Sequence, residues 1–136
     1  MANWTNNHLK IEGDQDQIDS LYKKFSSYYD EDLKNQGEIM FPDFEKVIPI
    51  PTEADRNNDW TTKNWGTKWP AQNASKESPQ TFYFKTPWNT PEPIIRELSK
   101  QYPTLIFTVI FSLEEDRYTI NYSYKCKAGK TEEIQQ

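Results

Sequence analysis

Two kinds of hydrophobic periodicity alternate along this chain, and their order limits what it can fold into. Alternation with period two predicts half-buried strands at residues 4–12, 65–69, 81–88 and 117–125. Helical spacing predicts helices at 14–29 and 90–102, and the run 105–113 resembles a strand buried on both faces. The order is β-α-(long connection)-β-β-α-β-β. It predicts one α+β domain over residues 1–136 of the ferredoxin-like split βαβ type, an antiparallel sheet of about five strands with two helices on one face.

Both predicted helices carry end signals. Asp14 is a favourable N-cap residue, and Gln17 three residues later completes a capping-box pattern. Thr90 can cap the second helix, Pro91 suits its first position and Pro103 ends it. These signals predict that both helices form and at which residue each of them begins.

The segments outside this pattern are predicted to be irregular. A long connection, residues 30–59, would contain a short strand at 38–41 and pack through Phe41, Phe44, Val47, Ile48 and Ile50. Long irregular segments in small domains are often functional, but a lid over one end of the core explains this segment equally well. Residues 70–80 are predicted to form a loop, and residues 127–136 a frayed tail.

Aromatic residues make up 15% of the chain, and tryptophan is concentrated near its middle. The run Trp65-Gly66-Thr67-Lys68-Trp69 is predicted to pair with 82–88 as a hairpin. A binding surface would combine its aromatic and basic side chains with others nearby: Trp60, Tyr83, Lys85 and Trp88. Such a surface could stack nucleic-acid bases. Alternatively, the rings form the core, because apolar residues are only 35% of the chain.

Charge and cysteine content exclude some classes of protein. A net charge of −5 argues against a general phosphate-binding protein, which needs clustered Lys and Arg, although it permits a protein that imitates nucleic acid. The single Cys126 excludes an internal disulfide and suits a reducing cytosol. No signal-peptide h-region opens the chain, and its longest apolar-rich run is too short to span a membrane. We therefore expect a cytoplasmic protein.

Several short motifs resemble the YubB-type family of ferredoxin-like domains, small proteins carried by phages and plasmids. They are Asn3-Trp4 with Asn7, Leu9, Ile11 and Gly13; Ile48-Pro49-Ile50-Pro51; Trp65-Gly66-Thr67-Lys68-Trp69; Phe84-Lys85-Thr86-Pro87-Trp88 with Pro91, Pro93 and Leu98; Tyr102-Pro103; and Leu105-Ile106-Phe107. The chain departs from the family at Thr5, where a cysteine often stands. The resemblance implies a ferredoxin-like fold and a mobile-element origin, and it implies no reaction.

Catalytic groups are sparse in this sequence. The only histidine, His8, sits among ordinary polar residues of a predicted strand, and it is far in sequence from Cys126. Carboxylate pairs such as Glu114 and Glu115 fall in predicted turns, where they are usually solvated. The four glycines are scattered, so no phosphate-binding loop is recognisable. The sequence gives no reason to expect a cofactor or a metal.

Three functions remain. The first is a non-catalytic mobile-element protein that binds and inhibits or sequesters a host protein, such as a factor of a defence system. The second is a binder of single-stranded nucleic acid or nucleotides through an aromatic sheet face, and the third is an uncharacterised enzyme centred on His8 or on carboxylates. We favour the first. Its candidate binding residues are Trp65, Lys68, Trp69 and Trp88, and the acidic run Asp30, Glu31 and Asp32.

Overall fold

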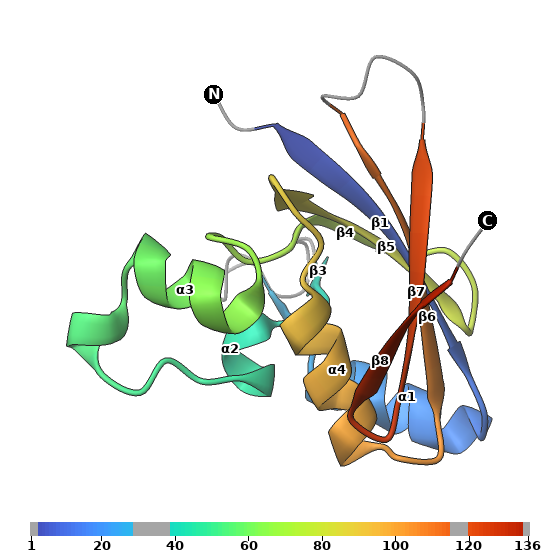
Figure 1. Cartoon of the computed structure of the whole chain (residues 1–136). Helices are drawn as coiled ribbons and strands as arrows, with labels where there is room; N and C mark the ends of the chain where they lie inside the picture. The colour runs from blue at the N-terminus through green and yellow to red at the C-terminus, as the bar shows by residue number, and fades with distance from the viewer. Residues whose placement is uncertain (1–2, 29–38, 115–119, 135–136) are drawn as a thin grey trace.

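The computed structural model describes residues 3–28, 39–114 and 120–134, and its centre is a six-stranded antiparallel sheet (Figure 1). The strands follow the order β4-β5-β1-β6-β7-β8. They are β1 Trp4–Glu12, β4 Gln72–Lys76, β5 Thr81–Pro87, β6 Ile106–Leu113, β7 Asn121–Lys127 and β8 Lys130–Ile134. The first four in this order belong to the predicted ferredoxin-like unit, and β7 and β8 extend the sheet beyond β6.

Strand alternation places the core on one face of the sheet. Leu9 and Ile11 are buried, and Thr5 and Asn7 share their face, as the sequence predicted for β1. His8 is exposed on the other face, which none of the described helices covers (Figure 1). Strand β6 follows the same rule, because Phe107 and Val109 are buried while Ile110 is 42% exposed. The prediction that this run is buried on both faces was therefore wrong.

Helices α1 (Gln15–Lys24) and α4 (Glu92–Gln101) cover the buried face (Figure 1). Asp14 caps α1 as predicted, accepting a hydrogen bond from the Gln17 N–H at 3.1 Å. The helix ends earlier than predicted, because Ser27–Tyr28 form a short strand, β2, that pairs with β3 (Ile39–Met40). Thr90 does not cap α4. Its hydroxyl instead lies 2.8 Å from that of Tyr124 on β7.

The described part of the long connection is more regular than predicted. Besides β3, which lies within the short strand predicted at 38–41, it contains helix α2 (Phe44–Val47), a 3₁₀ turn η2 (Glu53–Asp55) and helix α3 (Asn58–Trp65). The residues expected to pack do so: Phe41, Phe44 and Val47 are buried, and Ile48 and Ile50 are half-buried against the core. Helices α2 and α3 both contact α4, so the connection extends the core beside that helix.

The Trp65–Trp69 run is not a strand. Residues through Trp65 complete α3, which Asn57 caps by accepting a hydrogen bond from the Trp60 N–H at 2.9 Å. Gly66 then ends the helix in the left-handed conformation, with φ of +84°. The hairpin partner of β5 is β4 instead, inside the segment predicted to be a loop. An alternation of large and small residues over so short a run does not distinguish a strand from a helix end.

A turn predicted at Ala128-Gly129-Lys130 is confirmed, but the tail after it is not frayed, because Lys130–Ile134 form β8. Strands β7 and β8 are joined by Ala128 and Gly129, whose φ angles are +51° and +80°. Two such residues make the type I′ turn, whose twist matches that of the flanking strands. The Gly129 N–H also donates to Ser99 Oγ at 3.0 Å, which holds the turn against α4.

Ala128 is a poor residue for this turn, because an alanine at positive φ brings its Cβ close to the backbone. We expect Ala128→Asn to raise the free energy of unfolding by about 0.5–1 kcal/mol, since asparagine tolerates this conformation. Urea denaturation measures the change. Ala54→Asn on the exposed η2 turn, where φ is not positive, is the control and should change stability by less than about 0.5 kcal/mol. Equal effects of the two substitutions would contradict the turn assignment.

Candidate functional site

Three of the predicted binding residues meet at one end of the sheet, and Trp4 joins them. We call Trp4, Lys68, Trp69 and Trp88 the tryptophan–lysine surface. The Lys68 ammonium lies 5.0 Å from the ring centre of Trp69 and 5.7 Å from that of Trp88. The rings of Trp4 and Trp69 are 6.2 Å apart and tilted by 53°. These distances are those of cation–π and aromatic pairs.

Much of this surface is open to solvent. Trp69 is 39% exposed and Trp88 is 45% exposed, although both are large apolar side chains. Folding alone gives no reason to leave two neighbouring tryptophans outside the core. Contiguous exposed apolar patches of this kind commonly mark contact sites for other molecules.

Hydrogen bonds fix the loop that carries Lys68 and Trp69. The Thr61 hydroxyl on α3 donates to the Lys68 carbonyl at 2.9 Å. The Thr67 hydroxyl donates to the Trp69 carbonyl at 2.8 Å. Because both donors are themselves buried, the two side chains are presented from a rigid support.

Trp88 is held in an unfavourable backbone conformation, with φ of +69°. For a bulky residue this is a true outlier that the surroundings must impose. Its N–H donates to the Asn3 carbonyl at 2.8 Å, and the buried Thr86 hydroxyl donates to the Asn89 carbonyl. Asn7 in turn donates from Nδ2 to Thr86 Oγ1 at 2.9 Å. A buried polar network thus supports the turn that projects Trp88.

Trp65 does not belong to this surface. It is only 2% exposed, its ring contacts those of Phe44 and Trp60, and its Nε1–H donates to the Ile48 carbonyl at 2.9 Å. The interpretation of the tryptophans as core was therefore correct for Trp65. The remaining predicted binding residues, Asp30, Glu31 and Asp32, lie outside the described residues.

The open face of the sheet carries the only histidine. The His8 ring lies 5.0 Å from that of Tyr83, and the Tyr83 hydroxyl donates to Asn6 Oδ1 at 2.6 Å. Burial raises the pKa of Tyr83. Cys126 is buried on the opposite face, where burial also raises the pKa of its thiol, so His8 cannot activate it. Within the described residues, no group of three His, Cys, Asp or Glu side chains is placed to hold a metal ion.

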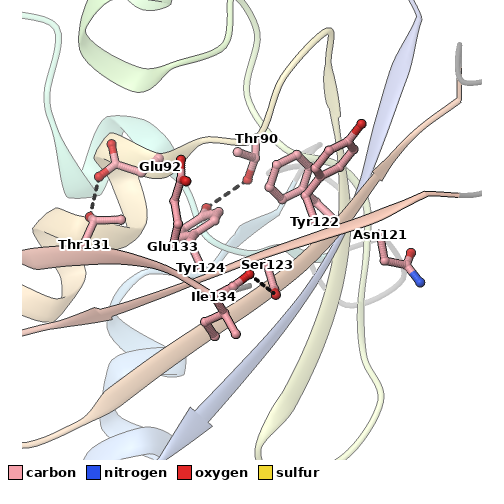
Figure 2. A pocket seen from close by; sticks show the side chains of 10 residues that line it. Thr90, Glu92, Asn121, Tyr122, Ser123, Tyr124, Thr131, Glu133 and Ile134 are labelled. Atoms are coloured by element: carbon pink, nitrogen blue, oxygen red, sulfur yellow. Dashed lines mark hydrogen bonds between the residues drawn. The ribbon is translucent and has the colours of Figure 1, made fainter. Parts of the chain in front are cut away.

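A cleft of about 370 Å³ lies between the start of α4 and the β7–β8 hairpin (Figure 2). Its aromatic wall consists of Phe111, Tyr122 and Tyr124, with the Phe111 and Tyr122 rings stacked 5.3 Å apart. Burial raises the pKa of Tyr124 far above its ordinary value, so its hydroxyl stays protonated. Glu92 and Glu133 add two carboxylates to the lining.

Sequence reasoning missed both Trp4 as a surface residue and this cleft as a whole. The alternation of β1 did place Trp4 on the face away from Leu9, which was a usable signal. The cleft joins the start of α4 to residues of three strands, β6, β7 and β8. Nothing in their local sequence indicates that they meet.

Two comparisons relate the chain to known proteins. A family model described as "Ferredoxin-like domain in Api92-like protein" matches residues 64–134. The crystal structure of a protein api92 from Yersinia pseudotuberculosis superposes with a TM-score of 0.59 and 12% sequence identity, over 100% of this chain and 99% of that chain. At this identity the likeness shows a common fold alone. No curated protein matches this chain. Among the described helices, none is long and apolar enough to cross a bilayer.

Proposed function

This chain belongs to the family of ferredoxin-like domains of Api92-like proteins, and on that fold we propose that it is a non-catalytic binding protein whose partner is a protein of a bacterial host. In this proposal it is an accessory protein of a phage or plasmid that inhibits or sequesters the host factor in the cytoplasm. The mobile-element origin is supported by the resemblance of its sequence motifs to YubB-type domains.

The observation that carries the proposal is the pair of exposed tryptophans with a lysine between them. Trp69 and Trp88 are 39% and 45% exposed, and Lys68 lies over both rings. Tryptophan is among the residues most enriched at binding hot spots, because one ring buries a large area with few rotatable bonds. A surface already ordered before binding also loses less entropy on association.

The test is an affinity pull-down of the tagged protein from bacterial lysate treated with nuclease, followed by measurement of the partner's Kd. We expect Lys68→Glu and Trp88→Asn each to weaken binding at least about tenfold, as hot-spot substitutions do. Asparagine is chosen at position 88 because it tolerates the positive φ found there.

Lys63→Glu is the matched control, because it makes the same charge change on the exposed side of α3 outside the tryptophan–lysine surface. Its Kd should stay within about twofold of the wild type. If Lys68→Glu behaves like Lys63→Glu, the surface does not bind the partner. Charge reversal at Asp30, Glu31 and Asp32 tests the acidic run independently.

A second candidate function is binding of single-stranded nucleic acid or a nucleotide. The observation that favours it is again Lys68, since an ammonium beside aromatic rings can accompany a phosphate next to a stacked base. It predicts quenching of tryptophan fluorescence by oligothymidine, with loss of quenching in Trp88→Asn. Recovery of nucleic acid and no protein in a pull-down without nuclease would favour this function over the first.

A further inference from the structure

The cleft at the β7–β8 hairpin has an aromatic wall and an acidic rim. Tyr122, which is 41% exposed, stacks on Phe111, and Phe111 also meets the ring of Tyr124 at 5.9 Å in an edge arrangement. Tyr124 is fixed by the Thr90 hydroxyl at 2.8 Å (Figure 2). The wall is therefore ordered without a ligand, and Tyr122 presents an open ring to the cleft.

The charge in the cleft is negative. Glu92 and Glu133 line it, and no lysine or arginine is among its lining residues in the described part of the chain. Glu92 accepts a hydrogen bond from the Thr131 hydroxyl and lies 3.5 Å from Arg96 Nε, so its charge is partly neutralised. Glu133 has no ion pair among the described residues. A cleft lined by both an open tyrosine ring and this carboxylate favours a cation.

Strand β8 borders this cleft and also ends the sheet. All five of its residues are exposed, and its partner β7 lies on one side only. Because the turn has two residues, Lys127 and Lys130 form a hydrogen-bonded pair, and such pairs alternate with non-hydrogen-bonded pairs along the hairpin. Thr131 and Glu133 occupy the non-hydrogen-bonded positions, so their backbone N–H and C=O groups point away from β7. Such an edge is a template for pairing with another extended segment. The side chains of Thr131 and Glu133 point into the cleft beside this edge (Figure 2).

We propose that this cleft binds an arginine side chain of a partner protein, carried by an extended segment that pairs with the edge of β8. The guanidinium stacks on Tyr122 and donates to Glu133, because a planar cation suits both an aromatic face and a carboxylate. Backbone pairing with β8 supplies affinity, and the cleft supplies side-chain specificity. This site is separate from the tryptophan–lysine surface.

The probe is a short fluorescein-labelled peptide of alternating threonine and arginine, which places every arginine on one face of an extended strand. Binding is measured by fluorescence anisotropy at physiological ionic strength, where the Debye length is about 8 Å. We expect Glu133→Lys to weaken binding at least about tenfold and Tyr122→Ala about fivefold. Methylating alternate backbone nitrogens of the peptide should also weaken binding about tenfold, because the pairing donors are lost.

Glu132→Lys is the control, since it makes the same change of net charge on the neighbouring residue of β8, which pairs with Lys125 on the opposite face. It should weaken binding less than about twofold. Lys68→Glu should leave the affinity for the threonine–arginine peptide unchanged, because Lys68 lies in the tryptophan–lysine surface and not in the cleft. This proposal and the proposed function can therefore fail separately. Equal losses in Glu132→Lys and Glu133→Lys would overturn the proposal, and so would equal binding of a threonine–glutamate peptide or of the methylated peptide.

Discussion

Replacing Trp65 by alanine is expected to lower the free energy of unfolding by about 3–5 kcal/mol, the loss typical of a large aromatic side chain removed from a core. Trp65 is 2% exposed and packs between Phe44 of α2 and Trp60 of α3. Its Nε1–H also satisfies the Ile48 carbonyl at 2.9 Å. Alanine would leave a cavity where α2, α3 and α4 meet and an unpaired carbonyl beside it.

Two further substitutions separate these contributions. Trp65→Phe keeps a ring but loses the donor to Ile48, and we expect it to cost about 1–2 kcal/mol. Trp69→Ala removes the same side chain four residues later, where it is 39% exposed, and should cost less than about 1 kcal/mol. Urea denaturation gives all three values. A loss in Trp65→Ala no greater than that in Trp69→Ala would show that Trp65 is not a core residue.

The second large effect is expected at Gly66, where alanine should lower the free energy of unfolding by about 2–3 kcal/mol. The φ of +84° disfavours any Cβ at this position. An added Cβ would also lie 2.8 Å from Pro93 Cδ and 3.2 Å from the Thr90 carbonyl. The start of α4 would have to move away from the end of α3, and the loop carrying Lys68 would move with it.

Gly129→Ala is a matched control, because its φ of +80° imposes similar backbone strain but its nearest contact would be 3.4 Å, to Lys100 Cβ. We expect it to cost about 1 kcal/mol. The excess in Gly66→Ala then measures the close approach of α3 to α4. If the two glycine substitutions lower the free energy of unfolding equally, the close approach of α3 to α4 does not add to the cost of Gly66→Ala. Gly66→Ala should also weaken partner binding through the tryptophan–lysine surface, whereas Gly129→Ala should not.

The candidate site was only partly predictable from the sequence. Lys68, Trp69 and Trp88 were predicted as candidate binding residues, and the structure brings their side chains together. Trp65 was included with them because a short alternation was interpreted as a strand. That interpretation missed the two residues that cap α3, Asn57 at its start and Gly66 at its end. They carried more information than the alternation of five residues.

The sequence by itself determined strands β1, β5, β6 and β7, helices α1 and α4, the buried face of β1 and the start of α1. These depend on periodicity and on capping within a few residues. The sequence also determined the ferredoxin-like class, which the family match confirms. Tertiary structure alone decided which tryptophans are buried, the positive φ of Trp88 and the cleft between α4 and β8. Each of these depends on contacts between segments far apart in the chain, and the free energy of such contacts is not encoded in any local pattern.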